Sequence, residues 1–200
     1  MGPGTPGRIT VAAGMGVYEV NLNDIVDIVN ATSLSGRINP FKTFAEFFAT
    51  ASVQVSPRWI LTLDYGHGIG SYNFTTQFGQ TEFSVTTEMP SLVMHWVVLD
   101  SGAYSIRVGG GGGYHFGSLT ESLGSQSYDY HGSGVGILAD LEANTAFSEH
   151  LYVYIGGMLR WEIIGNLTSA SGVSPIYSNG ASTTLHSFAA GVRLGLTYIF

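Results

Sequence analysis

Nine ionisable residues stand within apolar stretches of the chain, each next to bulky hydrophobic neighbours. They are Glu46, Asp64, His95, Arg107, Asp140, Glu142, Arg160, Glu162 and Arg193. In an apolar setting such groups must pair with one another or bind water, because an unpaired buried charge is strongly disfavoured. We therefore predict an ion-pair and hydrogen-bond network in the interior of the fold. A rigid network would fill that interior, whereas pairs that rearrange would gate a passage for ions or small solutes.

The five acids of this set outnumber its three arginines. A protonated acid, His95, water or a bound cation must therefore balance the charge. No group of histidines and acids has a spacing along the chain that is typical of a metal site. We predict no metal and no cofactor.

Catalysis would have to rest on the six histidines, because the chain has no cysteine. His186 and Ser187 are adjacent, and adjacent residues of a strand point to opposite faces, so they cannot form a dyad. His67 and Ser71 share a face but are spaced too far apart for direct contact. We predict no catalytic residues and no enzymatic activity.

An alternation of period two positions these residues, and this period is typical of β-strands. In the last segment, the apolar face carries Phe188, Ala190, Val192, Leu194, Leu196, Tyr198 and Phe200, and the other face carries Gly191, Arg193, Gly195 and Thr197. The same alternation recurs over residues 9–17, 47–55, 59–70, 83–99, 104–116, 135–147 and 151–163. Pro90 lacks a backbone donor, so we expect a bulge or an early strand end there. The pattern predicts eight strands.

The connections between these strands alternate in length. Residues 55–58, 99–103 and 147–150 form tight turns, and residues 20–42, 73–82, 118–132 and 166–184 form long polar loops. Short turns at one end and long loops at the other are typical of an up-and-down antiparallel β-barrel in an outer membrane.

The first long loop contains Leu22, Ile25, Val26 and Val29 at helical spacing. A short amphipathic helix there would lie on the outer leaflet or cap the barrel mouth. An apolar patch that packs against neighbouring loops accounts for the spacing equally well.

The composition agrees with a membrane barrel. Only 10% of residues are charged, against about 25% in soluble proteins, and glycine reaches 28 of 200. No apolar run approaches the roughly 20 residues of a membrane-spanning helix. The net charge of −7 argues against a nucleic-acid partner. Residues 1–7 are a Gly/Pro leader without signal-peptide features, and residues 8–200 form a single barrel domain.

The apolar face is bulky and almost free of charge, whereas the other face is small or polar, so we expect the apolar face to meet lipid. Aromatic girdles are expected at Trp59, Trp96 and Tyr104 near the turn end, and at Tyr72, Trp161 and Phe188 nearer the loop end. The glycines at 109–113 place no side chain inside, which predicts a cavity beside Arg107 or Tyr114.

The last eight residues, Arg193-Leu194-Gly195-Leu196-Thr197-Tyr198-Ile199-Phe200, resemble the C-terminal signal of bacterial outer-membrane β-barrels. The resemblance implies that the barrel-assembly machinery reads Arg193, Gly195, Tyr198 and Phe200. The broader strand pattern, over nearly the whole chain, resembles the small eight-stranded class of the OmpA transmembrane domain and OmpX, and more distantly OmpW.

A barrel of eight strands has a lumen just wide enough for side chains to fill. We therefore expect an integral outer-membrane protein with a structural or surface-interaction role, carried by long extracellular loops over a filled lumen. A gated narrow pore is the alternative, and a lipid A-modifying enzyme is a third possibility. The expected partners are outer-membrane lipids, lipopolysaccharide and the assembly machinery; the expected oligomeric state is a monomer.

Overall fold

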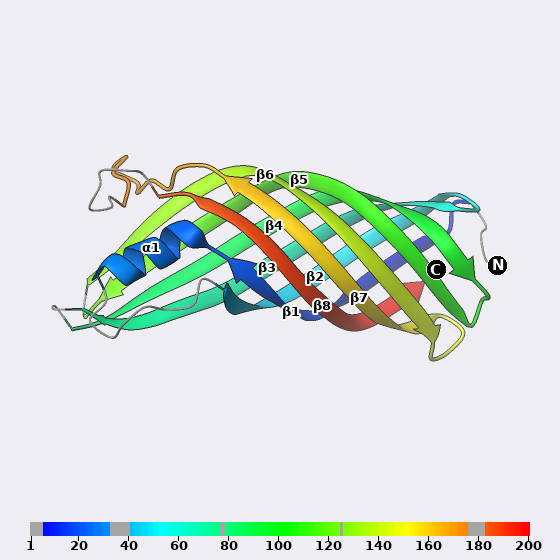
Figure 1. The fold of residues 1–200 in the computed structure, drawn as a ribbon. Coiled ribbons are helices and arrows are strands. Elements are labelled where there is room, and N and C mark those ends of the chain that lie inside the picture. The colour runs from blue at the N-terminus through cyan, green and yellow to red at the C-terminus, as the bar shows by residue number, and fades with distance from the viewer. Residues whose placement is uncertain (1–5, 33–40, 77–78, 125, 176–182) are drawn as a thin grey trace.

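The computed structural model describes residues 6–32, 41–76, 79–124, 126–175 and 183–200. Eight antiparallel strands form one closed barrel in the order of the chain, and the first strand pairs with the last (Figure 1). The strands are β1 (Ile9–Asn21), β2 (Phe41–Ser56), β3 (Trp59–Thr76), β4 (Gly79–Asp100), β5 (Tyr104–Leu123), β6 (Gln126–Ala146), β7 (Leu151–Ile164) and β8 (Leu185–Ile199). The helix α1 (Asn23–Thr32) lies at the end of the barrel opposite the two termini. Of the helical segments in the described ranges, none is long and apolar enough to cross a membrane.

The predicted fold class is confirmed, and the apolar face is the outer one. Along β8, Val192 and Leu194 are 58% and 60% exposed, whereas Arg193 between them is only 3% exposed. Exposed apolar side chains surround the barrel in the same way on all eight strands. A continuous apolar exterior over a polar interior is the arrangement of a barrel whose outer solvent is lipid.

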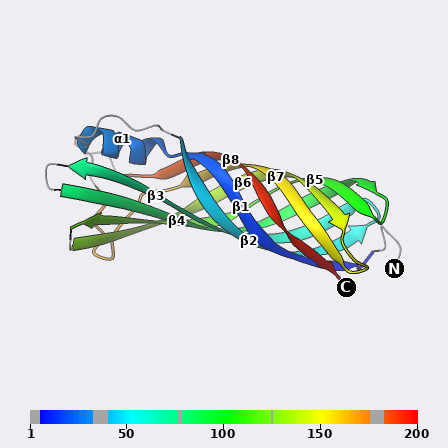
Figure 2. The ribbon, with the colours of Figure 1, turned by 90° about the horizontal axis from the view of Figure 1, so that it is seen from below.

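Two of the four predicted long loops are wrong. Strand β3 runs to Thr76 and β4 begins at Gly79, and β5 runs to Leu123 and β6 begins at Gln126. Each pair therefore forms a hairpin that projects beyond the rest of the barrel (Figure 2). Here the outer face is polar, as at Asn73 and Glu82, and the inner face carries buried apolar groups such as Phe83. The strand period is kept while the polarity of the two faces is exchanged, which is why these segments look like polar loops in the sequence.

The bulge or early strand end predicted at Pro90 is absent. Strand β4 is continuous from Gly79 to Asp100, and Pro90 stands opposite Tyr65 of β3 in regular register. On the side of β5 the pairing is interrupted: Glu88 pairs with Phe116 and Ser91 with Gly113, and no pair forms at Met89 or Pro90, in agreement with the missing backbone donor. The register with β5 shifts between Val97 and Leu99, near the turn.

Helix α1 packs on an apolar core at the loop end of the interior. Ile25 and Val29 are fully buried in one apolar core with inner-face residues of the strands, including Phe83 and Leu119. The carboxylate of Asp24 accepts a hydrogen bond from the backbone amide of Thr184 at 3.1 Å, which fixes the start of the helix near β8. Of the two helix positions expected, the structure has the one at the barrel mouth.

Candidate functional site

Glycines on the inner wall allow side chains two strands apart to meet. Gly16 of β1 stands opposite Arg193 of β8 on one side and opposite Glu46 of β2 on the other. A Cβ on Gly16 would lie 3.1 Å from Arg193 Cγ and 3.2 Å from Glu46 Oε2. The missing side chain therefore leaves the space in which the acid and the base pair.

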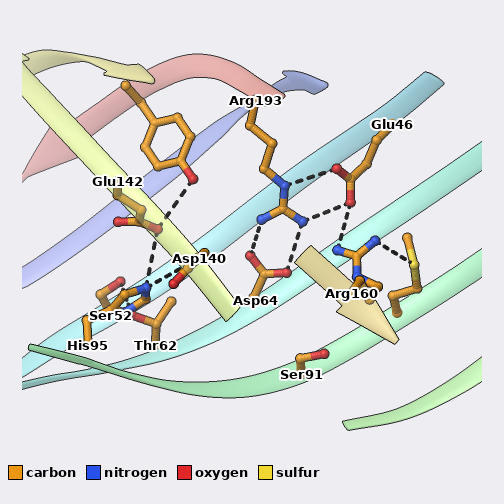
Figure 3. Close-up of polar contacts among 12 residues, drawn as sticks. Glu46, Ser52, Thr62, Asp64, Ser91, His95, Asp140, Glu142, Arg160 and Arg193 are labelled. Carbon is orange, nitrogen blue, oxygen red and sulfur yellow. Dashed lines mark hydrogen bonds and ion pairs between the residues drawn. The ribbon is translucent and has the colours of Figure 1, made fainter. Parts of the chain in front are cut away.

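The first group, which we term the central cluster, consists of Glu46, Asp64, Arg160 and Arg193 (Figure 3). The Arg193 guanidinium donates to Glu46 at 2.8 and 3.0 Å and to Asp64 at 2.7 and 3.2 Å. Arg160 donates to Glu46 at 3.1 Å, and its other terminal nitrogen lies 2.9 Å from the sulfur of Met89. All four charged side chains are at most 4% exposed. Two acids and two bases balance, and their bonds join strands β2, β3, β7 and β8.

The second group is the His95 cluster. His95 Nε2 lies 2.9 Å from Asp140 Oδ2 and 3.5 Å from Glu142 Oε1. The other ring nitrogen, Nδ1, lies 3.0 Å from the hydroxyl oxygen of Thr62. Arg107 donates its Nε–H to Glu142 Oε2. Two acids thus face one arginine, which leaves an excess of one negative charge next to an imidazole.

The third group is the His115 cluster. His115 Nε2 lies 3.0 Å from the hydroxyl of Ser91, and Nδ1 lies 3.3 Å from Glu162 Oε1. Ser187 donates to the other oxygen of Glu162 at 3.1 Å. The imidazole occupies the space over Gly136, where a Cβ would lie 2.1 Å from the ring. No arginine pairs with Glu162 among the described residues, so the second unbalanced acid also adjoins a buried histidine.

The structure places all nine predicted network residues on the inner wall. It adds Thr62, Ser91, His115 and Ser187 as neutral or titratable partners. That these side chains point into the barrel could be predicted from the alternation of residues along each strand. Their pairing could not, because the partner of each depends on the register between strands, and a sequence pattern does not fix that register.

Ser91, His115 and Glu162 contact one another in the arrangement of a nucleophile, a base and an acid. However, all three residues are buried, with exposed fractions of 2%, 0% and 5%. On the outer face, His67 pairs with Glu88 at 2.7 Å and not with Ser71.

The cavity expected beside Arg107 is present only towards the turn end. Its volume is about 50 Å³, and its lining includes Arg107, Asn144, Gln54 and Thr197. The space left by Gly109 is filled, because a Cβ there would lie 2.3 Å from both the His95 ring and the Asp140 carboxylate. Tyr114, the other expected neighbour of a cavity, lies on the outer face and is 53% exposed.

The aromatic residues expected in the girdles, apart from Tyr72, lie on the outer face. Trp59 stands opposite Trp96, and Trp161 opposite Phe188. Tyr104 is also exposed. Tyr72 corrects the prediction: it lies on the inner face of β3 and is 3% exposed, within the apolar core at the loop end.

The residues of the terminal signal divide between the two faces of β8. Arg193 is buried in the central cluster, and a Cβ on Gly195 would lie 2.4 Å from the backbone oxygen of Ala13. The Tyr198 and Phe200 rings pack edge to face outside, with centroids 5.0 Å apart.

No protein-family model matches the chain, and no curated protein matches it. Solved structures do. Ail, the attachment invasion locus protein of Yersinia pestis, is 10% identical, with a TM-score of 0.59 over 98% of this chain and 100% of that one. Neisserial surface protein A is 11% identical, with a TM-score of 0.58 over 96% and 97%. A major outer membrane protein from Thermus thermophilus is 12% identical, with a TM-score of 0.56 over 96% and 99%.

The chain has the fold of the small outer-membrane β-barrels. This confirms the class predicted from the strand pattern. An outer-membrane location, which the sequence predicts, agrees with this fold and with the apolar exterior.

Proposed function

We propose that this protein is an integral outer-membrane barrel whose lumen is closed to solutes and whose role is structural or one of surface interaction. The observation that carries the proposal is that two kinds of buried side chains line the interior. Ion-paired clusters lie in its middle, and an apolar core with α1 lies at its loop end, and we infer that both act as barriers to solutes.

The polar barrier resists opening because its bonds cross the barrel. Arg193 joins β8 to β2 and β3, and His95 joins β4 to β6. Separating a buried ion pair without replacing its partners costs about 3–5 kcal/mol. A path for hydrated ions would require several such separations together with displacement of the apolar core.

The projecting hairpins supply the surface for interaction. Between their tips lies a hollow of about 470 Å³ lined largely by polar side chains, among them Asn73, Gln80, Glu82 and Ser122. Such groups suit hydrogen bonding to an extracellular partner. Two similar structures, an attachment invasion locus protein and a neisserial surface protein, carry names that agree with a surface role.

The proposal includes the partners expected from the sequence. Lipids and lipopolysaccharide would contact the apolar exterior, and the assembly machinery would read the exposed Tyr198 and Phe200 during insertion. We propose a monomer that binds no nucleic acid, in agreement with the net charge of −7.

We also propose that the protein is not an enzyme. The serine, histidine and glutamate of the His115 cluster are too deeply buried to meet a lipid substrate. Incubation with lipid A followed by mass spectrometry of its acyl chains should show no change. A shortened or altered acyl pattern that is lost in Ser91→Ala would contradict this part of the proposal.

Conductance in a planar bilayer tests the closed lumen. The wild-type protein should give no steps above background, whereas the triple variant Ile25→Asn/Arg160→Ala/Arg193→Ala should conduct, because it removes both bases of the central cluster and disrupts the apolar core beside α1. The triple variant also shows that the barrel inserts in the assay. Steady unitary steps from the wild type, altered by Arg193→Ala, would overturn the proposal in favour of the gated pore.

A further inference from the structure

We propose that the His95 cluster is a binding site for one divalent transition-metal ion of the Zn²⁺ type. Its ligands would be His95 Nε2, Asp140 and Glu142 Oε1. One potential ligand atom from each residue lies within 4.8 Å of those of the other two, and all three side chains are buried. One imidazole and two carboxylates are ligands that zinc accepts, commonly as three protein groups with a water in the fourth position.

The spacing of the donor atoms fits such an ion. Tetrahedral bonds of about 2.0 Å separate neighbouring ligand atoms by about 3.3 Å. The distances from His95 Nε2 to Asp140 Oδ2 and Glu142 Oε1 are 2.9 and 3.5 Å. Both distances lie within a few tenths of an ångström of that value, and one oxygen of each carboxylate lies within 4.8 Å of the other. Figure 3 shows both carboxylates on the side of the imidazole that carries Nε2.

Asp140 gives an observation independent of this clustering. Its Oδ1 is buried and has no hydrogen-bond partner among the described residues. The residue is 7% exposed, so bulk water does not supply a hydrogen bond to that oxygen. An unpaired carboxylate oxygen in a buried site is costly, and a cation bound by the same carboxylate would remove much of that cost.

The surroundings orient two of the three ligands. The Thr62 hydroxyl can accept a hydrogen bond from His95 Nδ1–H, which leaves the Nε2 lone pair directed at the two acids. Arg107 holds Oε2 of Glu142, and the Tyr154 hydroxyl donates a long hydrogen bond of 3.4 Å to Oε1, the oxygen that faces His95 Nε2 and would bind the ion. These are the hydrogen bonds that usually support metal ligands in proteins. Gly109 provides the room, because a Cβ there would clash with both His95 and Asp140.

The charges of the site sum to zero when an ion and a hydroxide are bound. Asp140 and Glu142 carry two negative charges, and Arg107 carries one positive charge. A divalent ion adds two positive charges, and a zinc-bound water ionises near neutral pH, so one bound hydroxide brings the sum to zero. The central cluster has no such excess of acid, which makes the His95 cluster the better cation site.

The ion would enter from the turn end. The cavity of about 50 Å³ there reaches Arg107 and Asn144, and it is large enough for water. Asn144 lies on the same inner face of β6 as Glu142, two residues along the strand. An ion that displaces the Arg107 side chain from this cavity meets the Glu142 carboxylate first.

Metal binding to the folded barrel in detergent tests the site, with Zn²⁺ and Co²⁺ as probes after removal of metals by a chelator. The wild type should retain a single ion per barrel through dialysis, and Co²⁺ should give the strong visible absorption of a four-coordinate site. His95→Gln and Asp140→Asn should each weaken binding by at least about 100-fold, and Thr62→Val by about 10-fold. Heat-dependent gel migration verifies that each variant is folded.

His115→Gln is the matched control, because His115 is also a buried histidine of the lumen that contacts one hydroxyl and one glutamate. It should bind the ion as the wild type does. The histidines outside the lumen, such as the partly exposed His67 and the exposed His131, could hold metal adventitiously. Retention that is unchanged in folded His95→Gln or Asp140→Asn would assign the ion to them and overturn the proposal. Absence of binding to the folded wild type would also overturn it. Neither result alters the conductance expected for a closed lumen.

Discussion

Arg193 holds the carboxylates of Glu46 and Asp64 in a site that water does not reach. Replacing it by methionine leaves two buried acids with only Arg160 as a base. We expect Arg193→Met to lower the free energy of unfolding by about 3–5 kcal/mol, measured by urea titration of the reconstituted barrel. Arg58→Met, at an exposed turn, should change it by less than about 0.5 kcal/mol. Equal effects of the two variants would contradict the assigned role of Arg193.

Gly136 supports the His115 ring, and its replacement tests the packing of the inner wall. In Gly136→Ala the new methyl group would overlap the imidazole, so His115 must leave Ser91 or the strand must shift. We expect a loss of about 1–3 kcal/mol in stability. In Gly157→Ala, on the neighbouring strand β7, a Cβ meets nothing within 4 Å, and the change should stay within about 0.5 kcal/mol. A tolerated Gly136→Ala would mean that the ring does not occupy this space.

The residues of the network could be predicted because a strand with one lipid-facing side tolerates charge only on its opposite, inward side. Their grouping into three clusters could not be predicted. His95 meets Asp140 across Gly109, and that meeting depends on the registers of β4 with β5 and of β5 with β6. The excess of acid was visible in the sequence, but its position beside two particular histidines was not.

Among the elements, strands within the lipid belt were predicted well and those beyond it were not. Within the belt, apolar and polar residues alternate with a constant sense, as along β8. Beyond it, β3–β6 face water on the outside and an apolar core on the inside, so residues such as Asn73 and Glu82 suggest loops. The faces exchange polarity because the outer solvent changes from lipid to water.

Helix α1 is held at the barrel mouth by its buried apolar residues. Ile25 is fully buried, so Ile25→Asn should release the helix from the core and raise the hydrogen exchange of the amides over residues 23–30 at least about tenfold. Asp27→Asn, at an exposed position of the same helix, should leave that exchange unchanged. Hydrogen exchange in the half of the barrel nearest the turn end should be unchanged in both variants. Exchange of α1 that is already fast in the wild type would show that it does not close the mouth.

At the scale of the whole molecule, the shortage of charge follows from the location of the surface. Most of the outer wall faces lipid, where a charge costs about 2–4 kcal/mol at mid-bilayer. Among the described residues, charges therefore lie mostly in the paired clusters inside and towards the ends of the barrel, and Glu88 on the outer face is paired with His67. The excess of glycine has a related cause, because a narrow lumen that holds large charged side chains leaves no room for a Cβ beside them.

The three tryptophans provide the most direct test of this arrangement. Trp59, Trp96 and Trp161 are the only tryptophans of the chain, and they are 47%, 45% and 56% exposed on the outer wall. In bilayers that contain brominated lipid, the fluorescence of the reconstituted barrel should be quenched strongly, while acrylamide in the water should have little effect. Strong quenching by acrylamide, with no effect of brominated lipid, would place the apolar face away from the membrane and contradict a barrel whose outer wall meets lipid.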